Sequence, residues 1–219
     1  MGRTLLSWSG GKDSAVALEV MRAAGTPPDG LVTTFVRDRD EVSHHGVSRS
    51  LLERQAAAIG LPLLAVELPD PCPNEAYNAA LAEAFATIDD LEAVAYGDLF
   101  LEDHRTWRSE QLARLGLEAR FPLWGYDTAD LARRLVEGSW QATVCTVDTD
   151  RLDASFCGRA YDAAFLADLP EGIDPAGEPG EFHTFVTAGP VLRHRAPVRV
   201  TGTWTGTDGR FVRAQLTAA

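Results

Sequence analysis

The chain has 219 residues, of which 45% are hydrophobic, and its 32 acidic and 20 basic residues leave a formal net charge of −12. This length suits one sizeable domain, or one domain with a smaller appendage, and the hydrophobic content is ordinary for a soluble globular protein. An acidic surface repels phosphate backbones, and no apolar run approaches the roughly 18 residues that cross a bilayer, so we expect neither a nucleic acid nor a membrane as the main partner.

Cysteine usage indicates a reducing compartment. Cys72, Cys145 and Cys157 are scattered, odd in number and form no Cys-x-x-Cys pair. This pattern argues against a disulfide framework and against a structural zinc site. The N-terminal Met1-Gly2-Arg3 leads into a short strand and shows no secretory signal, so we expect a cytoplasmic protein.

The first predicted strand, Thr4 to Trp8, leads through Ser9-Gly10-Gly11-Lys12-Asp13-Ser14 into a helix that begins near Asp13. Glycines allow a backbone to approach a phosphate closely, and the free N–H groups at a helix N-terminus attract anions. Lys12 is the only lysine in the chain. The segment is therefore predicted to bind the phosphates of a nucleotide.

Two other nucleotide-binding loops do not fit this segment. A Walker loop requires Ser or Thr after Gly-Lys and a glycine five residues earlier, and Asp13 and Leu6 stand at those positions. The G-x-G-x-x-G fingerprint fails because Gly10 and Gly11 are adjacent and no third glycine follows. The S-G-G-x-D-S pattern resembles the PP-loop ATP pyrophosphatases of the adenine nucleotide alpha hydrolase superfamily, with Lys12 at the variable position.

Short apolar strands then alternate with amphipathic helices through the first two-thirds of the chain. Further strands are predicted at Leu31–Val36, Leu63–Leu68, Ala93–Tyr96 and Ala119–Phe121. Helices are predicted to end at Gly25 and Gly60, to run from a cap at Asn74 to about Ile88, and to span Thr106 to Leu115. This alternation predicts an α/β fold, with a doubly wound, Rossmann-like parallel sheet covered by helices on both faces.

The pattern changes after Gly125. Asp127 is predicted to cap a helix that ends at Glu137, and a strand is predicted at Gln141–Val147. Strands are also predicted at Phe182–Thr187, Val198–Trp204 and Phe211–Leu216, the last two joined as a hairpin across Asp208-Gly209. We therefore divide the chain into a nucleotide-binding domain, residues 1–125, and a smaller α+β substrate-binding subdomain, residues 126–219.

Ligands of doubly wound sheets bind outside the carboxyl ends of the strands, where the winding reverses. This rule brings the ends of the second and fourth predicted strands, at Thr33-Thr34 and Gly97-Asp98, close to the loop. Backbone groups at Thr33 and Thr34 are candidates for reading the adenine edge. Asp98 is a candidate Mg²⁺ ligand on the phosphates, with a helix N-cap or turn residue as the alternative.

Two further segments concentrate acidic and basic side chains. Leu99 to Arg108 holds Glu102, His104 and Arg108, which are either substrate contacts or part of a solvated helix start. Gly177 to Thr184 places two carboxylates and an imidazole just before a strand. His183 in this segment is a candidate base or substrate contact, with a buried structural histidine as the alternative.

Several motifs in one order resemble the diphthine–ammonia ligase family over nearly the whole chain. They are the initial loop, Gly97-Asp98 with Trp107-Arg108, Arg114 to Leu117, Pro122-Leu123-Trp124 and the late G-E-x-G-E-F-x-T run. The resemblance implies an ATP-dependent C–N ligase that uses Mg²⁺. A carboxylate and ATP would give an acyl adenylate and pyrophosphate, and ammonia would then displace AMP.

The resemblance also implies roles for particular residues. The phosphates would be held by Ser9, Gly10, Gly11, Lys12, Asp13 and Ser14, with Lys12 and Asp13 taking part in catalysis. The acceptor would be contacted by Glu178, Gly180, Glu181 and Thr184. Either His183 or Glu181 would accept the proton from ammonia.

The chain departs from the family pattern at Ala176, where a cysteine is usual, and at His183, where eukaryotic-type members carry an acidic residue. The run GDLFLEDHR, which begins at Gly97, resembles a bacterial branch, so the acceptor is open between a small molecule and a protein-borne carboxylate.

A non-catalytic, stress-sensor-like ATP-binding protein is the first alternative to this ligase function. An RNA-thiolating PP-loop enzyme is the second, although it requires Cys-x-x-Cys pairs and a basic face. A homo-oligomer is compatible with all three functions.

Overall fold

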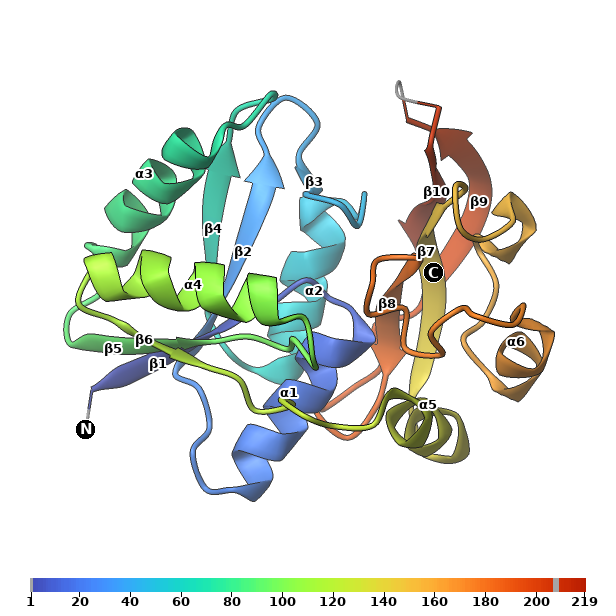
Figure 1. Ribbon diagram of the computed structural model, residues 1–219, viewed down its shortest axis with the longest axis horizontal. Coiled ribbons are helices and arrows are strands. Elements are labelled where there is room, and N and C mark those ends of the chain that lie inside the picture. The colour runs from blue at the N-terminus through green and yellow to red at the C-terminus, as the bar shows by residue number, and fades with distance from the viewer. Residues whose placement is uncertain (1, 207–208) are drawn as a thin grey trace.

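The computed structural model describes residues 2–206 and 209–219, and Figure 1 shows two sheets side by side, each with its own helices. The first sheet contains β1 (Arg3–Ser7), β2 (Gly30–Val36), β3 (Glu41–Val42), β4 (Leu63–Leu68), β5 (Leu91–Ala95) and β6 (Glu118–Arg120). Its helices are α1 (Lys12–Ala23), α2 (Arg49–Ile59), α3 (Asn74–Phe85) and α4 (Glu102–Arg114).

The second sheet is antiparallel, in the order β8 (Phe182–Ala188), β7 (Gln141–Asp148), β10 (Phe211–Ala218) and β9 (Val198–Thr205). The helices α5 (Thr128–Glu137) and α6 (Ala163–Asp168) and a short 3₁₀ turn at Ala154–Phe156 accompany it. The predicted β9–β10 pairing is confirmed, whereas Asp208 of the predicted turn lies outside the described residues. No helix within residues 2–206 and 209–219 combines the length and apolarity that a membrane span requires.

The first sheet is wound in two directions from β1. Its parallel strands lie in the order β4, β2, β1, β5 and β6, while β3 pairs antiparallel with the end of β2. The chain therefore moves outward from β1 through β2 to β4, and then returns to the other side of β1 with β5. This is the predicted doubly wound sheet, and its ligand-binding crevice is expected at the carboxyl ends of β1 and β5.

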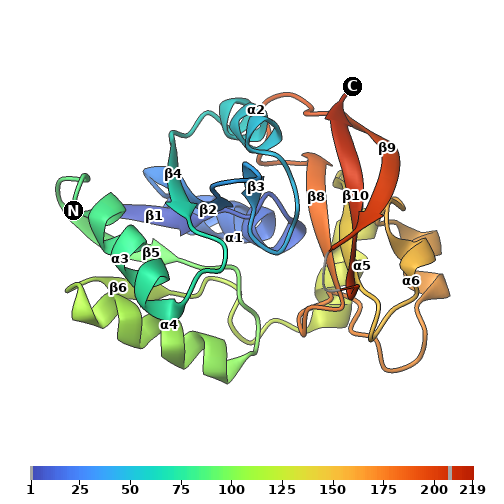
Figure 2. The ribbon, with the colours of Figure 1, turned by 90° about the horizontal axis from the view of Figure 1, so that it is seen from above.

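Helices cover both faces of this sheet because successive side chains of β1 point to opposite sides. Leu6 belongs to the core that contains Leu18 of α1 and Leu52 of α2, and none of the three is exposed. Leu5 belongs to a second core, which α3 and α4 complete. Figure 2 shows α2 on one side of β1 and β2, and α3 and α4 on the other. Burying each of these leucines stabilises the fold by about 1.5–3 kcal/mol.

The two sheets are joined at the glycine loop by a buried amide. Gln55 of α2 accepts a hydrogen bond from Trp8 Nε1 at 2.7 Å and donates from Nε2 to the carbonyl oxygens of Gly10 at 3.1 Å and Val186 at 2.7 Å. The backbone N–H of Val186 in β8 also donates to the Gly10 carbonyl at 2.9 Å. The second sheet is therefore attached directly to the loop that follows β1.

Two local predictions differ from the structure, and one short strand was missed. Asn74 does not cap α3, because it is already the first helical residue and Pro73 occupies the cap position without a side-chain hydrogen bond. Helix α4 begins at Glu102, earlier than the predicted Thr106. The short β3 was not predicted, because two residues are too few to show an alternating pattern. The cap at Asp127 is confirmed, since its carboxylate accepts the N–H of Asp130 at 2.9 Å.

Candidate active site

A cleft of about 970 Å³ lies at the carboxyl ends of β1, β2 and β5, between the two sheets. It brings together many of the residues singled out in the sequence. Its lining includes Ser9, Asp13, Ser14, Thr33, Thr34, Gly97, Asp98, His104, Arg108, Glu178, Gly180 and His183. Residues that are more than 160 positions apart in the chain thus share one wall.

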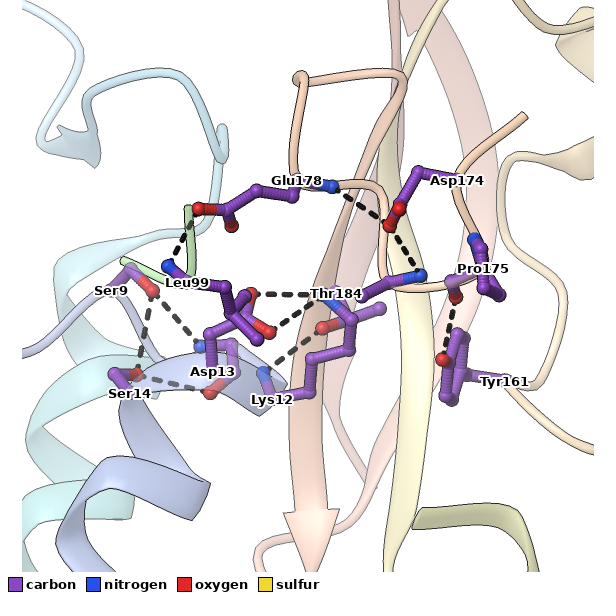
Figure 3. Close-up of polar contacts among 12 residues, drawn as sticks. Ser9, Lys12, Asp13, Ser14, Leu99, Tyr161, Asp174, Pro175, Glu178 and Thr184 are labelled. Carbon is purple, nitrogen blue, oxygen red and sulfur yellow. Dashed lines mark hydrogen bonds and ion pairs between the residues drawn. The ribbon is translucent and has the colours of Figure 1, made fainter. Parts of the chain in front are cut away.

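The loop after β1 is held in shape by its own two serines (Figure 3). Ser9 Oγ accepts the N–H of Gly11 at 3.2 Å, and Ser14 Oγ donates to the Gly11 carbonyl at 3.0 Å. Gly10 adopts a positive φ of 80°, which favours glycine. In the described part of the chain, the N–H groups of Asp13 and Ser14 donate to no other residue, and the N–H of Asp13 interacts with its own carboxylate, so the start of α1 offers the N–H of Ser14 to an anion.

Gly97 lets the end of β5 approach this loop. A Cβ at position 97 would lie 2.9 Å from the carbonyl carbon of Asp13 and 3.0 Å from the Ser14 nitrogen. Because those neighbours are backbone atoms, no side chain can be accommodated there without moving the loop. The sequence pattern placed Gly97 near the loop, and the structure shows that the contact is between backbones.

Lys12 is buried beneath the loop instead of pointing into the cleft. Its ammonium donates to both carboxylate oxygens of Asp13, at 2.9 and 3.0 Å, and its side chain is only 2% exposed. Asp13 lines the cleft, whereas Lys12 does not. Burial raises the pKa of Asp13, and the Lys12 ammonium opposes this shift. A direct contact between Lys12 and a phosphate stays a prediction.

The segment from Gly177 to Thr184 closes over the loop from the second sheet. Thr184 Oγ1 accepts the N–H of Lys12 at 3.0 Å, so a residue of β8 satisfies the first amide of α1 (Figure 3). Glu178 Oε1 accepts the N–H of Leu99, just after β5, at 2.7 Å. These two hydrogen bonds therefore attach the Gly177–Thr184 segment to the start of α1 and to the chain that follows β5.

Glu178 has an altered acidity. Burial, aided by the nearby carboxylates of Asp13 and Asp98 and opposed by the N–H of Leu99, raises the pKa of Glu178 to about 7. A carboxylate with this pKa is half protonated at neutral pH. It is therefore suited to take up and release a proton under cellular conditions.

Asp98 lies at the floor of the cleft against two basic side chains. Its carboxylate is 3.1 Å from Arg108 Nε and 3.7 Å from His104 Nδ1, and it is 10% exposed. Asp98 does not cap α4, whose N-cap is Leu101. Among the described residues, no group of three or more His, Cys, Asp or Glu side chains could hold a metal by itself. Mg²⁺ at nucleotide sites needs only one or two carboxylates in addition to phosphates, so Asp13 and Asp98 fit a metal shared with a polyphosphate.

Two predicted residues lie away from the cleft. The side chain of Glu102 is 68% exposed and lies 3.8 Å from Arg105, as expected for a solvated helix start. Glu181 is buried and does not line the cleft, and its Oε1 lies 3.8 Å from Arg151. Gly10, Gly11 and Thr184 form the layer behind the cleft wall.

The structure adds two histidines that no sequence pattern linked to the site. His44 and His45 line the cleft, and the ring of His45 lies 4.4 Å from that of His183. Burial lowers the pKa of His45 to about 3 and that of His183 well below its usual value, so both imidazoles are neutral at pH 7. The adjacent His44-His45 pair was visible in the sequence, but nothing in its spacing related it to His183.

An ion pair on the second sheet, between a buried aspartate and an exposed arginine, was also missed. Arg210 donates to both oxygens of Asp148, at 2.7 and 2.6 Å, and both residues line the cleft with Arg151. The guanidinium of Arg210 holds the pKa of Asp148 below its usual range. The two partners are 62 residues apart, so only the pairing of β7 with β10 brings them together.

Comparison with known proteins identifies the family. Residues 2–119 match the diphthamide synthase N-terminal domain, and residues 127–215 match the diphthamide synthase C-terminal domain. No curated protein sequence matches the chain significantly. A solved structure titled as a predicted subunit of tRNA methyltransferase from Methanocaldococcus jannaschii is 16% identical, with a TM-score of 0.44, over 88% of this chain and 99% of its own. With both of its parts matched to one family, this protein is a member of the diphthamide synthase family of PP-loop ATP pyrophosphatases.

Proposed function

We propose that the protein amidates a carboxylate acceptor with ATP and ammonia. The acceptor carboxylate attacks the α-phosphorus of ATP, the bond to the β-phosphate breaks, and pyrophosphate leaves. Ammonia then attacks the acyl carbon, the bond to the AMP oxygen breaks, and an amide and AMP result. The observation that carries this proposal is the meeting of the Ser9–Ser14 loop and the Gly177–Thr184 segment in one cleft.

The nucleotide would lie along the first sheet. The N–H of Ser14, with the hydroxyls of Ser9 and Ser14, suits the phosphates. Thr33 and Thr34 line the cleft at the end of β2, where the adenine is expected. Asp98 and Asp13 would hold Mg²⁺, which when bound neutralises charge on the pyrophosphate.

Lys12 contributes a positive charge to this arrangement although it does not line the cleft. Two carboxylates in a cleft that accepts a polyphosphate would repel the ligand, and the Lys12 ammonium offsets the charge of Asp13 at 2.9 Å. The loop is therefore close to neutral before ATP arrives. The N–H of Ser14 can then stabilise the negative charge that develops on the leaving pyrophosphate.

The amidation step requires a proton acceptor, because ammonium predominates over ammonia at neutral pH. The carboxylates of Asp13, Asp98 and Glu178 line the cleft and attract ammonium, although Lys12 and Arg108 offset part of the charge of the first two. We assign the first proton to Glu178, whose pKa of about 7 allows it to accept one. The second proton, released when nitrogen bonds to carbon, passes to solvent water, because burial holds the pKa of His183 well below its usual value and makes this imidazole a weak base.

RNA thiolation is disfavoured by the state of the cysteines. Burial raises the pKa of Cys145 and raises that of Cys157 to about 12, so neither supplies a thiolate at neutral pH. The pKa of Cys72, which lines the cleft, is raised by burial and by Asp70. These thiols lack the reactivity that sulfur transfer requires.

The direct test combines the protein with ATP, Mg²⁺, ammonium and a panel of carboxylic acids. We expect AMP, pyrophosphate and an amide in equal amounts with an accepted acid, measured by chromatography and mass spectrometry. Formation of ADP would contradict cleavage between the α and β phosphates. Tight binding of ATP without any AMP across the panel would instead support the non-catalytic alternative.

A further inference from the structure

A groove of about 530 Å³ lies between α3 and α4, on the face of the first sheet that these helices cover. Figures 1 and 2 show the two helices next to one another over this face. Helix α3 contributes Tyr77, Asn78 and Ala82, and α4 contributes Trp107 and Leu112. The volume is within the range of about 300–1,000 Å³ that small-molecule sites usually have.

The walls of the groove are mainly aromatic and aliphatic. The rings of Tyr77 and Trp107 lie 5.6 Å apart at an angle of 45°, and Tyr96 lies at the base between the helices. Asn78 Oδ1 is buried and has no hydrogen-bond partner among the described residues. A buried acceptor without a partner costs about 1–3 kcal/mol, which a ligand with an N–H or O–H donor would recover.

The groove adjoins the candidate active site. The residues that line both cavities are Tyr77, Leu81, Phe85, Tyr96, Trp107 and Arg108. Arg108 stands where the cavities meet, with its guanidinium 4.3 Å from the centre of the Tyr96 ring and its Nε 3.1 Å from Asp98. The two cavities are therefore close enough in the fold to share the side chains that separate or connect them, with Arg108 among these shared residues.

We propose that this groove binds the apolar body of the acceptor, which rests on the proposed amidation. The acceptor is then a small carboxylic acid that carries an aromatic or heteroaromatic ring. Its ring lies against Tyr77 and Trp107, and a ring N–H or O–H donates to Asn78 Oδ1. Its carboxylate extends past Arg108 into the cleft, where the α-phosphate of ATP is expected.

Binding of indole-3-propionate to the full chain tests this assignment without turnover. We expect it to bind at least about tenfold more tightly than propionate, because the ring adds apolar contact. The N-methylated indole acid, which cannot donate to Asn78, should bind several-fold more weakly than the parent acid. Calorimetry or ligand-observed NMR would measure all three affinities.

Two pairs of variants locate the binding. Trp107→Ala removes one wall and Ala82→Phe fills the groove, and both should weaken indole-3-propionate at least about fivefold. Trp204→Ala on β9 and Ala86→Phe after the end of α3 make the same chemical changes outside the groove, and both should bind like the wild type. Circular dichroism and thermal melting would establish that each variant is folded.

Three results would overturn the assignment. One is equal affinity for indole-3-propionate and propionate, and another is unchanged binding in Trp107→Ala and Ala82→Phe. The third is evidence that something else occupies the groove. A loss of ATP affinity in Trp107→Ala would indicate that ATP binds there, and a wild-type dimer that Ala82→Phe dissociates would indicate a second copy of the chain. If indole-3-propionate binds in the groove but no acid yields AMP, the amidation fails while the groove stands as an aryl-carboxylate site.

Discussion

A single carboxylate, that of Glu178, combines a fixed position with an altered acidity. The N–H of Leu99 holds one of its oxygens at 2.7 Å, and burial raises its pKa to about 7. The two effects come from different parts of the chain, since Leu99 follows β5 whereas Glu178 precedes β8. The proposed proton acceptor therefore exists only when both sheets are in place.

Glu178→Gln tests this role through pH dependence. Below pH 7 the carboxyl of Glu178 is protonated and cannot accept a proton, so amide formation should rise as the pH passes through about 7. Glu178→Gln should lower the rate with ammonium about 10²–10⁴-fold, and the rate of the variant should keep rising above pH 7 as free ammonia forms, where the wild type levels off. Hydroxylamine is already neutral at pH 7, so the variant should form hydroxamate at a rate much closer to that of the wild type. An equal loss with both nucleophiles would assign Glu178 to binding instead of proton transfer.

The pair of Lys12 and Asp13 gives a second prediction at this scale. Lys12→Ala leaves the Asp13 carboxylate in the loop without its cation, so we expect loss of ATP-dependent pyrophosphate release and a lower melting temperature. Lys12→Met combined with Asp13→Asn removes both charges and should restore much of the melting temperature, but not the activity. Pyrophosphate release that is unchanged in Lys12→Ala would contradict the assignment of the loop.

At the scale of elements, the N-terminus of α1 is the point where three parts of the chain meet. Thr184 of β8 accepts its first amide, and Gly97 after β5 contacts the backbone of Asp13 and Ser14. The N–H of Ser14 donates to no other described residue, which leaves it as a donor for the proposed phosphates. The position of the helix start thus depends on neighbouring elements and not on its own cap.

Gly97→Ala should disturb this junction. The added methyl would meet the Asp13 backbone at 2.9 Å, so the loop must move and ATP affinity should fall at least about tenfold. Gly202→Ala on β9 is the matched control, since its methyl meets only a glutamine oxygen at 3.6 Å. Equilibrium binding of ATP would measure both variants. Wild-type affinity in Gly97→Ala would show that the loop tolerates displacement.

At the scale of the whole molecule, the cleft is a consequence of how the two sheets are joined. A single hydrophobic core contains Leu6 of β1, Phe185 of β8 and Ala214 of β10, so the sheets share their interior. Gln55 crosses this core with three hydrogen bonds, to Trp8, Gly10 and Val186. The walls of the cleft are therefore expected to keep their separation when a ligand binds.

Gln55→Leu tests this joint. The substitution conserves size but leaves the Trp8 N–H without its buried acceptor and removes a donor to Gly10 and Val186, which should destabilise the protein by about 2–4 kcal/mol. Gln215→Leu, on the exposed side of β10, should change stability by less than about 0.5 kcal/mol. Urea unfolding measures both. Similar midpoints for the two variants would show that Gln55 does not carry the attachment.

Much of the fold followed from local patterns in the chain. The strands at β1, β2 and β4, the helix ends at Gly25 and Gly60 and the loop from Ser9 to Ser14 depend on contacts between near neighbours, which sequence order records. The alternation of strands and helices also determined the doubly wound sheet, because parallel strands require crossover connections. The late Gly177–Thr184 segment was recognisable as a motif for the same reason.

Only the tertiary structure decided how these motifs act on one another. The burial of Lys12 against Asp13, the raised pKa of Glu178 and the contact of the His45 ring with that of His183 all depend on how the two sheets pack together. The groove between α3 and α4 likewise depends on how far apart two helices pack. Electrostatic shifts and cavities arise from burial and from separations between remote residues. The amino-acid sequence by itself therefore determined which chemical groups this protein carries, and the packing of its two sheets decided which of them meet.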